Sequence, residues 1–87
     1  MTPENIGSTI LFSPEQCRAA RGLLKWSQDD LAKAAACSRP LVSKYEDGQP
    51  VSDVYVRAIS AVLAEAGVTV VEENGGGAGV RWRTPRK

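Results

Sequence analysis

The sequence predicts a mainly α-helical domain of four short helices, followed by a C-terminal β-hairpin. Between residues 13 and 67, apolar residues recur every three or four positions in four segments, and each segment begins at a serine. After Gly67 the spacing changes, because the β-type run 68–71 and the alternating run 80–83 flank a glycine-rich loop. The length of 87 residues suffices for one small domain of this kind.

The first predicted helix covers residues 13–25. Ser13, Pro14 and Gln16 form a capping-box pattern with proline at the first helical position. Residues 1–12 precede this helix and are expected to form an N-terminal tail without basic residues. Helical spacing places Cys17, Ala20 and Leu24 on one apolar face of this helix. Leu23 lies on the flank of that face.

Residues 27–47 are predicted to form two short helices separated by a tight turn. Ser27 begins the first and Ser38 the second, because a serine hydroxyl caps the free backbone N–H groups of a first turn. Each helix has an apolar face, formed by Leu31, Ala32 and Ala35 in the first and by Leu41, Val42 and Tyr45 in the second. The opposite face of the second helix carries Arg39, Pro40, Ser43 and Lys44.

The last predicted helix runs from Ser52-Asp53 to about Ala66 and stops at Gly67. Its apolar stripe consists of Val56, Ile59, Val62, Leu63 and Ala66. The hairpin over 68–83 follows, and residues 84–87 are expected to form a basic tail. An isolated hairpin is marginal in water, so its apolar side needs a surface to cover it. That side consists of Val68, Val70, Val80 and Trp82.

The composition narrows the classes of function. An apolar content of 43% with 6% aromatic residues fits a globular chain. The net charge is +1, so any attraction to DNA must come from the local placement of charges. With two cysteines and no histidine, the chain lacks the usual zinc spacings and any Cys–His dyad, and no metal or cofactor is expected. An enzyme is not expected, because no nucleophile, base and orienting group can be assembled from these residues.

The sequence also indicates where the protein resides. It has no run of about 18 apolar residues and no charged segment leading into an apolar core at its start. We therefore expect a cytoplasmic protein with no membrane partner. Cys17 and Cys37 lie at inward positions of their segments, so they are interpreted as small buried hydrophobic residues in a reducing compartment.

Two short helices joined by a tight turn are typical of a helix-turn-helix motif. Residues 13–67 resemble the Cro/lambda-repressor-like (XRE-type) family in a set of matching positions: Arg21, Trp26-Ser27-Gln28, Leu31-Ala32, Ser38, Val42 and Tyr45-Glu46-Asp47-Gly48. The pattern departs at Ala36, where the family usually has a turn glycine, and at Cys37, where it usually has an aliphatic residue. Ala36 must adopt a positive φ or belong to a slightly different turn.

The resemblance implies a four-helix lambda-repressor-like domain whose second motif helix enters the DNA major groove. The candidate base-contacting residues are Arg39, Pro40, Ser43 and Lys44. Arg39 lies in the first turn, and its planar fork matches O6 and N7 of guanine. The candidate backbone-contacting residues are Ser27, Gln28 and Ser38. The resemblance also implies an internal ion pair between Arg21 and Glu46.

The predicted function is that of a small sequence-specific transcriptional regulator that binds double-stranded operator DNA. Repression is favoured because the sequence contains no second domain to sense a ligand. A homodimer formed by the hairpin, through Val68, Val70, Val80 and Trp82, would match an inverted-repeat operator. The alternative is an antitoxin that binds both its operator and a partner toxin. A stable complex with a second protein on purification would favour that alternative.

Overall fold

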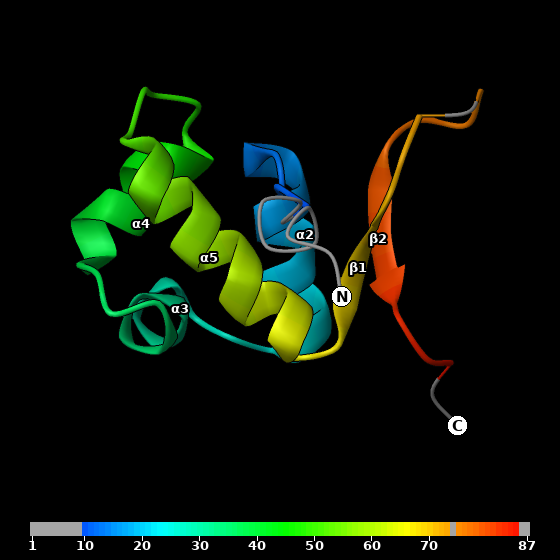
Figure 1. The fold of residues 1–87 in the computed structure, drawn as a ribbon, viewed down its shortest axis with the longest axis horizontal. Coiled ribbons are helices and arrows are strands. Elements are labelled where there is room, and N and C mark those ends of the chain that lie inside the picture. Colours follow the sequence, from blue (N-terminus) through cyan, green and yellow to red (C-terminus); the bar gives the residue numbers. More distant parts are fainter. Residues whose placement is uncertain (1–9, 74, 86–87) are drawn as a thin grey trace, which may run out of the picture.

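The computed structural model describes residues 10–73 and 75–85 of the chain. These ranges contain four helices and two strands: α2 (Pro14–Leu24), α3 (Gln28–Ala34), α4 (Arg39–Glu46), α5 (Asp53–Glu65), β1 (Val68–Val71) and β2 (Gly79–Trp82). Figure 1 shows α3 and α4 at one end, the hairpin at the other, and α2 and α5 between them. The predicted class, mainly α with a C-terminal hairpin, is confirmed. Most of the expected N-terminal tail and the last two residues of the basic tail lie outside the described residues.

Serine side chains begin three of the helices, as predicted. Ser13 Oγ accepts the N–H of Gln16 over 3.1 Å, and Gln16 Oε1 accepts the N–H of Ser13 over 3.0 Å. The N-cap serines of α3 and α4 also accept backbone N–H groups of their own first turns. Ser52 occupies the N-cap position of α5, but its side chain makes no capping hydrogen bond. Three helix starts are therefore fixed by local side-chain contacts.

The core lies where the helices meet the first strand. Its fully buried large side chains include Phe12, Leu31, Val42, Ile59 and Leu63. Leu23, expected on the flank of the apolar face of α2, is instead 37% exposed.

The backbone of Phe12, just before α2, forms hydrogen bonds with side chains of α4 and α5. Ser60 Oγ accepts the N–H of Phe12 over 2.9 Å, and the Tyr45 hydroxyl donates to the Phe12 carbonyl. These two contacts fix the start of the described chain between α4 and α5.

The hairpin is antiparallel, with Val68 opposite Trp82 and Val70 opposite Val80. Its second strand is Gly79–Trp82, one residue earlier than the predicted run 80–83. Val68 is fully buried, and the other three residues of the apolar side are half-buried against the core. The side chain of Val68, expected to contribute to a dimer contact, therefore packs entirely within its own chain.

None of the helices in the described ranges combines the length and the apolar character needed to cross a membrane.

Candidate nucleic-acid interface

The turn between α3 and α4 sets the direction of the second motif helix. Ala36 adopts a φ of 57°, so the first of the two expected alternatives holds, and alanine occupies the left-handed conformation of a turn glycine. This conformation costs an alanine about 1–2 kcal/mol. The turn is closed by the Cys37 N–H, which donates to the Ala32 carbonyl over 2.9 Å, and by the buried side chain of Ala35.

Helix α4 has one buried face and one exposed face. Val42, Tyr45 and Glu46 are buried, with exposed fractions of 0%, 8% and 2%. The predicted base-contacting side chains lie on the other sides of the helix, where Arg39, Pro40 and Lys44 are exposed and Ser43 is half-buried. The buried face therefore holds α4 against the core, while Arg39 and Lys44 are exposed to solvent.

The start of α3 and the start of α4 share a surface hollow. It has a volume of about 450 Å³ and is lined by Arg21, Ser27, Gln28, Asp29 and Arg39. Ser27 lies exposed at this surface, and so does Ser38 at the start of α4. Each serine oxygen accepts a backbone N–H as a cap, which leaves the hydroxyl hydrogen available to donate. The hollow therefore brings together Arg21 of α2, Arg39 of α4 and the polar and acidic side chains at the start of α3, whereas Ser38 is exposed outside its lining.

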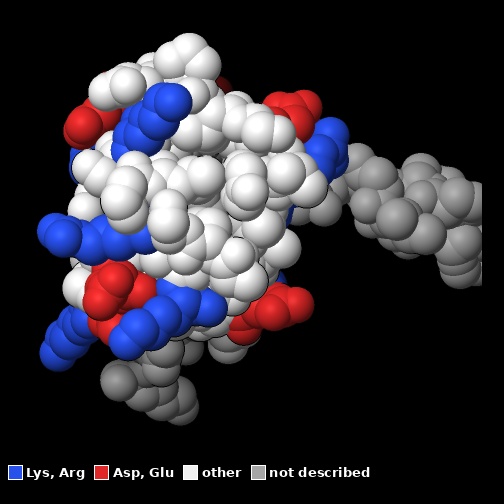
Figure 2. All heavy atoms as spheres, turned by 90° about the vertical axis from the view of Figure 1, so that its left-hand side faces the viewer, with Lys and Arg blue, Asp and Glu red and all other residues white. Residues whose placement is uncertain are grey.

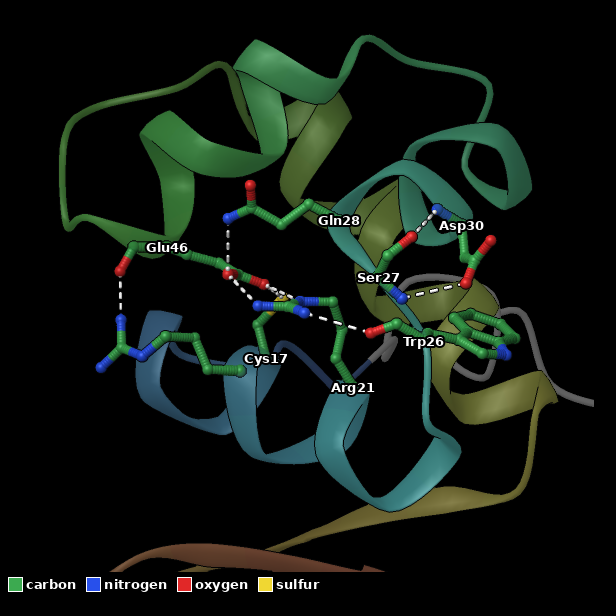
Figure 3. A network of polar contacts seen from close by, with 8 residues as sticks. Cys17, Arg21, Trp26, Ser27, Gln28, Asp30 and Glu46 are labelled. Atoms are coloured by element: carbon green, nitrogen blue, oxygen red, sulfur yellow. Dashed lines mark hydrogen bonds and ion pairs between the residues drawn. The ribbon is translucent and has the colours of Figure 1, made fainter.

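Glu46 connects the last turn of α4 to α2 and α3 (Figure 3). Arg21 binds its carboxylate in a bidentate manner, with Nε 2.7 Å from Oε2 and Nη2 2.7 Å from Oε1. Gln28 Nε2 donates to Oε1 over 3.1 Å, and Cys17 Sγ donates to Oε2 over 3.2 Å. Arg18 donates to the Glu46 backbone carbonyl. The ion pair implied by the resemblance is thus present and forms part of a larger network.

The charges in this network are set by burial and by hydrogen bonds. Burial alone would raise the pKa of Glu46, but hydrogen bonds from Arg21, Gln28 and Cys17 hold that pKa below its ordinary value. The hydrogen bond to Glu46 raises the pKa of Arg21. Burial, followed by the hydrogen bond to Glu46, raises the pKa of Cys17. At neutral pH the network holds a carboxylate, a guanidinium and a neutral thiol.

Gln28, predicted to contact the DNA backbone, also forms a hydrogen bond within the protein. One hydrogen of its amide is directed to Glu46, and the same nitrogen carries a second hydrogen that this bond does not use. Sequence reasoning missed the contact because 18 residues separate the two side chains. The sequence indicated only part of the network: Cys17 and Arg21 lie four residues apart on one face of α2, and both contact Glu46.

Charged side chains of both signs lie around this end of the molecule. Figure 2 shows Lys and Arg side chains around a broad uncharged area, with Asp and Glu side chains beside several of them. Within the described part of the chain, no group of three or more His, Cys, Asp or Glu side chains is arranged to hold a metal ion. The chain matches no protein-family model, and no curated protein matches it.

Proposed function

We propose that this protein is a sequence-specific DNA-binding transcriptional regulator that inserts α4 into the major groove of its operator. The observation that carries the proposal is the exposed face of α4, which presents Arg39, Pro40 and Lys44 from a helix whose other face is buried. An α-helix with its side chains is about 10–12 Å across, which matches the width of the major groove, about 12 Å.

The residues of this surface take different roles in the proposed complex. Arg39, in the first turn of α4, donates in a bidentate manner to O6 and N7 of a guanine. Pro40 contacts a thymine methyl group, and Ser43 reaches a base edge or a phosphate. Lys44 binds phosphate as a mobile point charge, because its ammonium group lacks the fixed fork of arginine.

Backbone contacts orient the protein on the duplex. Ser27 and Ser38 donate their hydroxyl hydrogens to phosphate oxygens, and Gln28 donates the amide hydrogen that Glu46 does not use. A phosphate bound by Ser27 and Gln28 would also lie beside Arg21 and Arg39, which line the same hollow together with Asp29. Binding of two such units to an inverted repeat would cover a promoter and repress transcription.

The proposal is tested by selecting duplexes that bind the protein from a random-sequence library. The selected duplex and a shuffled duplex are then titrated with the wild type and with Arg39→Ala. We expect Arg39→Ala to cost about 1–3 kcal/mol on the selected duplex and little on the shuffled one. Arg81→Ala is the matched control, because Arg81 is exposed on the hairpin, at the opposite end of the molecule from α4 (Figure 1).

Lys44→Ala separates phosphate binding from base recognition. We expect weaker binding to every sequence, and the slope of log affinity against log salt should fall by about one. An unchanged slope contradicts the phosphate role of Lys44. Failure of the selection to enrich any sequence contradicts the proposed function as a whole.

A further inference from the structure

Glu46 fixes the orientation of the Gln28 amide, although the two residues lie on different helices. Gln28 Nε2 donates to Glu46 Oε1 over 3.1 Å, and Figure 3 shows the amide oxygen of Gln28 directed away from the carboxylate. An ionised carboxylate offers only hydrogen-bond acceptors, so it binds the nitrogen end of an amide and rejects the oxygen end. The ionised Glu46 therefore determines which way round the Gln28 amide lies.

The carboxylate that holds this amide is itself held by several donors. The side chain of Glu46 is 2% exposed, and Arg21 donates to both of its oxygens over 2.7 Å. Cys17 Sγ donates to Oε2 over 3.2 Å. The same guanidinium also fixes the start of α3, because Arg21 Nη1 donates to the Trp26 carbonyl over 3.1 Å. The side chain of Gln28 and the backbone two residues before it are thus attached to one buried ion pair.

We infer that Glu46 is a positioning residue for DNA binding, which holds the Gln28 amide so that its second N–H is directed to a backbone phosphate. The inference rests on the proposed function, because that function supplies the phosphate. Gln28 is half-buried and lines the same hollow as Arg39, beside the face of α4 proposed to enter the major groove. Glu46 itself is buried and does not contact DNA in this arrangement.

The benefit of this arrangement is that the side chain is ordered before DNA binds. Glutamine has three rotatable side-chain bonds, and ordering such a side chain only in the complex weakens binding roughly two- to tenfold. The contact with Glu46 removes most of this loss. Glutamine in place of Glu46 would not do the same, because its amide has one acceptor oxygen, for which Arg21 and Gln28 would compete.

The three glutamines of the chain allow the orientation to be tested without DNA, by ¹⁵N relaxation of their side-chain NH₂ groups. Gln16 is the ordered reference, because its amide forms hydrogen bonds at both ends. Gln49 is the exposed reference, in the loop after α4. We expect the order parameter of Gln28 to approach that of Gln16 in the wild type. In Glu46→Gln it should fall towards that of Gln49, while Gln16 stays unchanged.

The phosphate contact is tested on a selected duplex in which single phosphates are replaced, one at a time, by neutral methylphosphonates. The replacement that weakens binding of the wild type but not of Gln28→Ala identifies the phosphate that Gln28 contacts. Glu46→Gln should bind the unmodified duplex roughly two- to tenfold more weakly and should lose sensitivity at that same phosphate. Sensitivity at the phosphate identified in the same way with Lys44→Ala should be retained.

This pattern separates positioning from a merely structural role. If Glu46 only stabilised the fold, its replacement would leave the sensitivity at the Gln28 phosphate unchanged relative to the others. Circular dichroism melting sets a temperature at which each variant is folded, and the comparison of Gln28 with Gln16 and Gln49 in the wild type needs no variant.

The outcomes distinguish the inference from the proposed function. A wild-type Gln28 amide as mobile as that of Gln49 overturns the inference, and so does a Glu46→Gln variant that keeps full sensitivity at the Gln28 phosphate. A wild type that binds no duplex overturns the proposed function and the phosphate role with it. The relaxation data still show in that case whether Glu46 holds the amide.

Discussion

Removal of the Arg21 guanidinium should destabilise the fold strongly, because Glu46 would lose its only ionic partner among the described residues. The Glu46 side chain is 2% exposed, whereas that of Arg21 is 20% exposed. In Arg21→Ala, the buried carboxylate keeps only the neutral donors of Gln28 and Cys17. Breaking a buried pair in this way costs about 3–5 kcal/mol. A chain of 87 residues has a total stability of about 4–13 kcal/mol, so this variant should lose a large fraction of its stability and unfold at a much lower urea concentration than the wild type.

The coupling is measured by a double-mutant cycle in urea, with unfolding followed by circular dichroism. Arg21→Met is the milder first variant, because it keeps the aliphatic stem of the side chain and removes the charged group. Glu46→Gln is the second, because it keeps the side-chain shape and removes the charge. We expect a coupling free energy above about 1 kcal/mol, the upper range of exposed pairs. A smaller value would refute the reasoning, since the two residues would then behave as surface charges.

Three further predictions concern stability. The pKa of Glu46 is lowered in the folded protein, so its contribution is present above the unfolded pKa and is lost as the pH falls through the folded value. Urea midpoints between pH 7 and pH 3 should therefore fall more for the wild type than for Glu46→Gln; equal falls would contradict this. Ala36→Gly should stabilise by up to about 1 kcal/mol by relieving the positive φ, whereas the control Ala34→Gly within α3 should destabilise by a similar amount. Ser60→Ala should cost about 1–3 kcal/mol, because the Phe12 N–H then lacks its acceptor, and an unchanged thermal midpoint would rule this out.

The helix boundaries could be predicted from the sequence because their signals are local. A serine that caps its own first turn needs only the next three residues, and Ser13, Ser27 and Ser38 all behave in this way. The buried face of α3 follows from helical spacing, and so do Val42 and Tyr45 of α4, whereas the predicted Leu41 is half-buried and the charged Glu46 is buried instead. The predicted range of the second strand was shifted by one residue, since its true start at Gly79 depends on pairing with Val71.

Contacts between distant residues could not be predicted in the same way. The Phe12 backbone and the Ser60 hydroxyl are 48 residues apart, and no local pattern marks Ser60 as buried within an apolar helix. The positive φ of Ala36 depends on how α3 and α4 pack, so the sequence left two alternatives open. For the candidate site, the exposed residues of α4 followed from its periodicity. The attachment of Gln28 to Glu46 required the tertiary structure.

The network around Glu46 separates the residues that hold α4 from the residues proposed to read DNA. The C-terminal end of α4 is fixed by Arg18 and Arg21, and its N-terminal end by the Ser38 cap. Arg39 and Lys44, by contrast, have side chains that form no hydrogen bond or ion pair with any described residue. Truncating either one removes no internal contact of this kind, so the free energy of unfolding should stay within about 0.5 kcal/mol of the wild type. A loss of operator affinity without a change in stability can then be attributed to the contact with DNA.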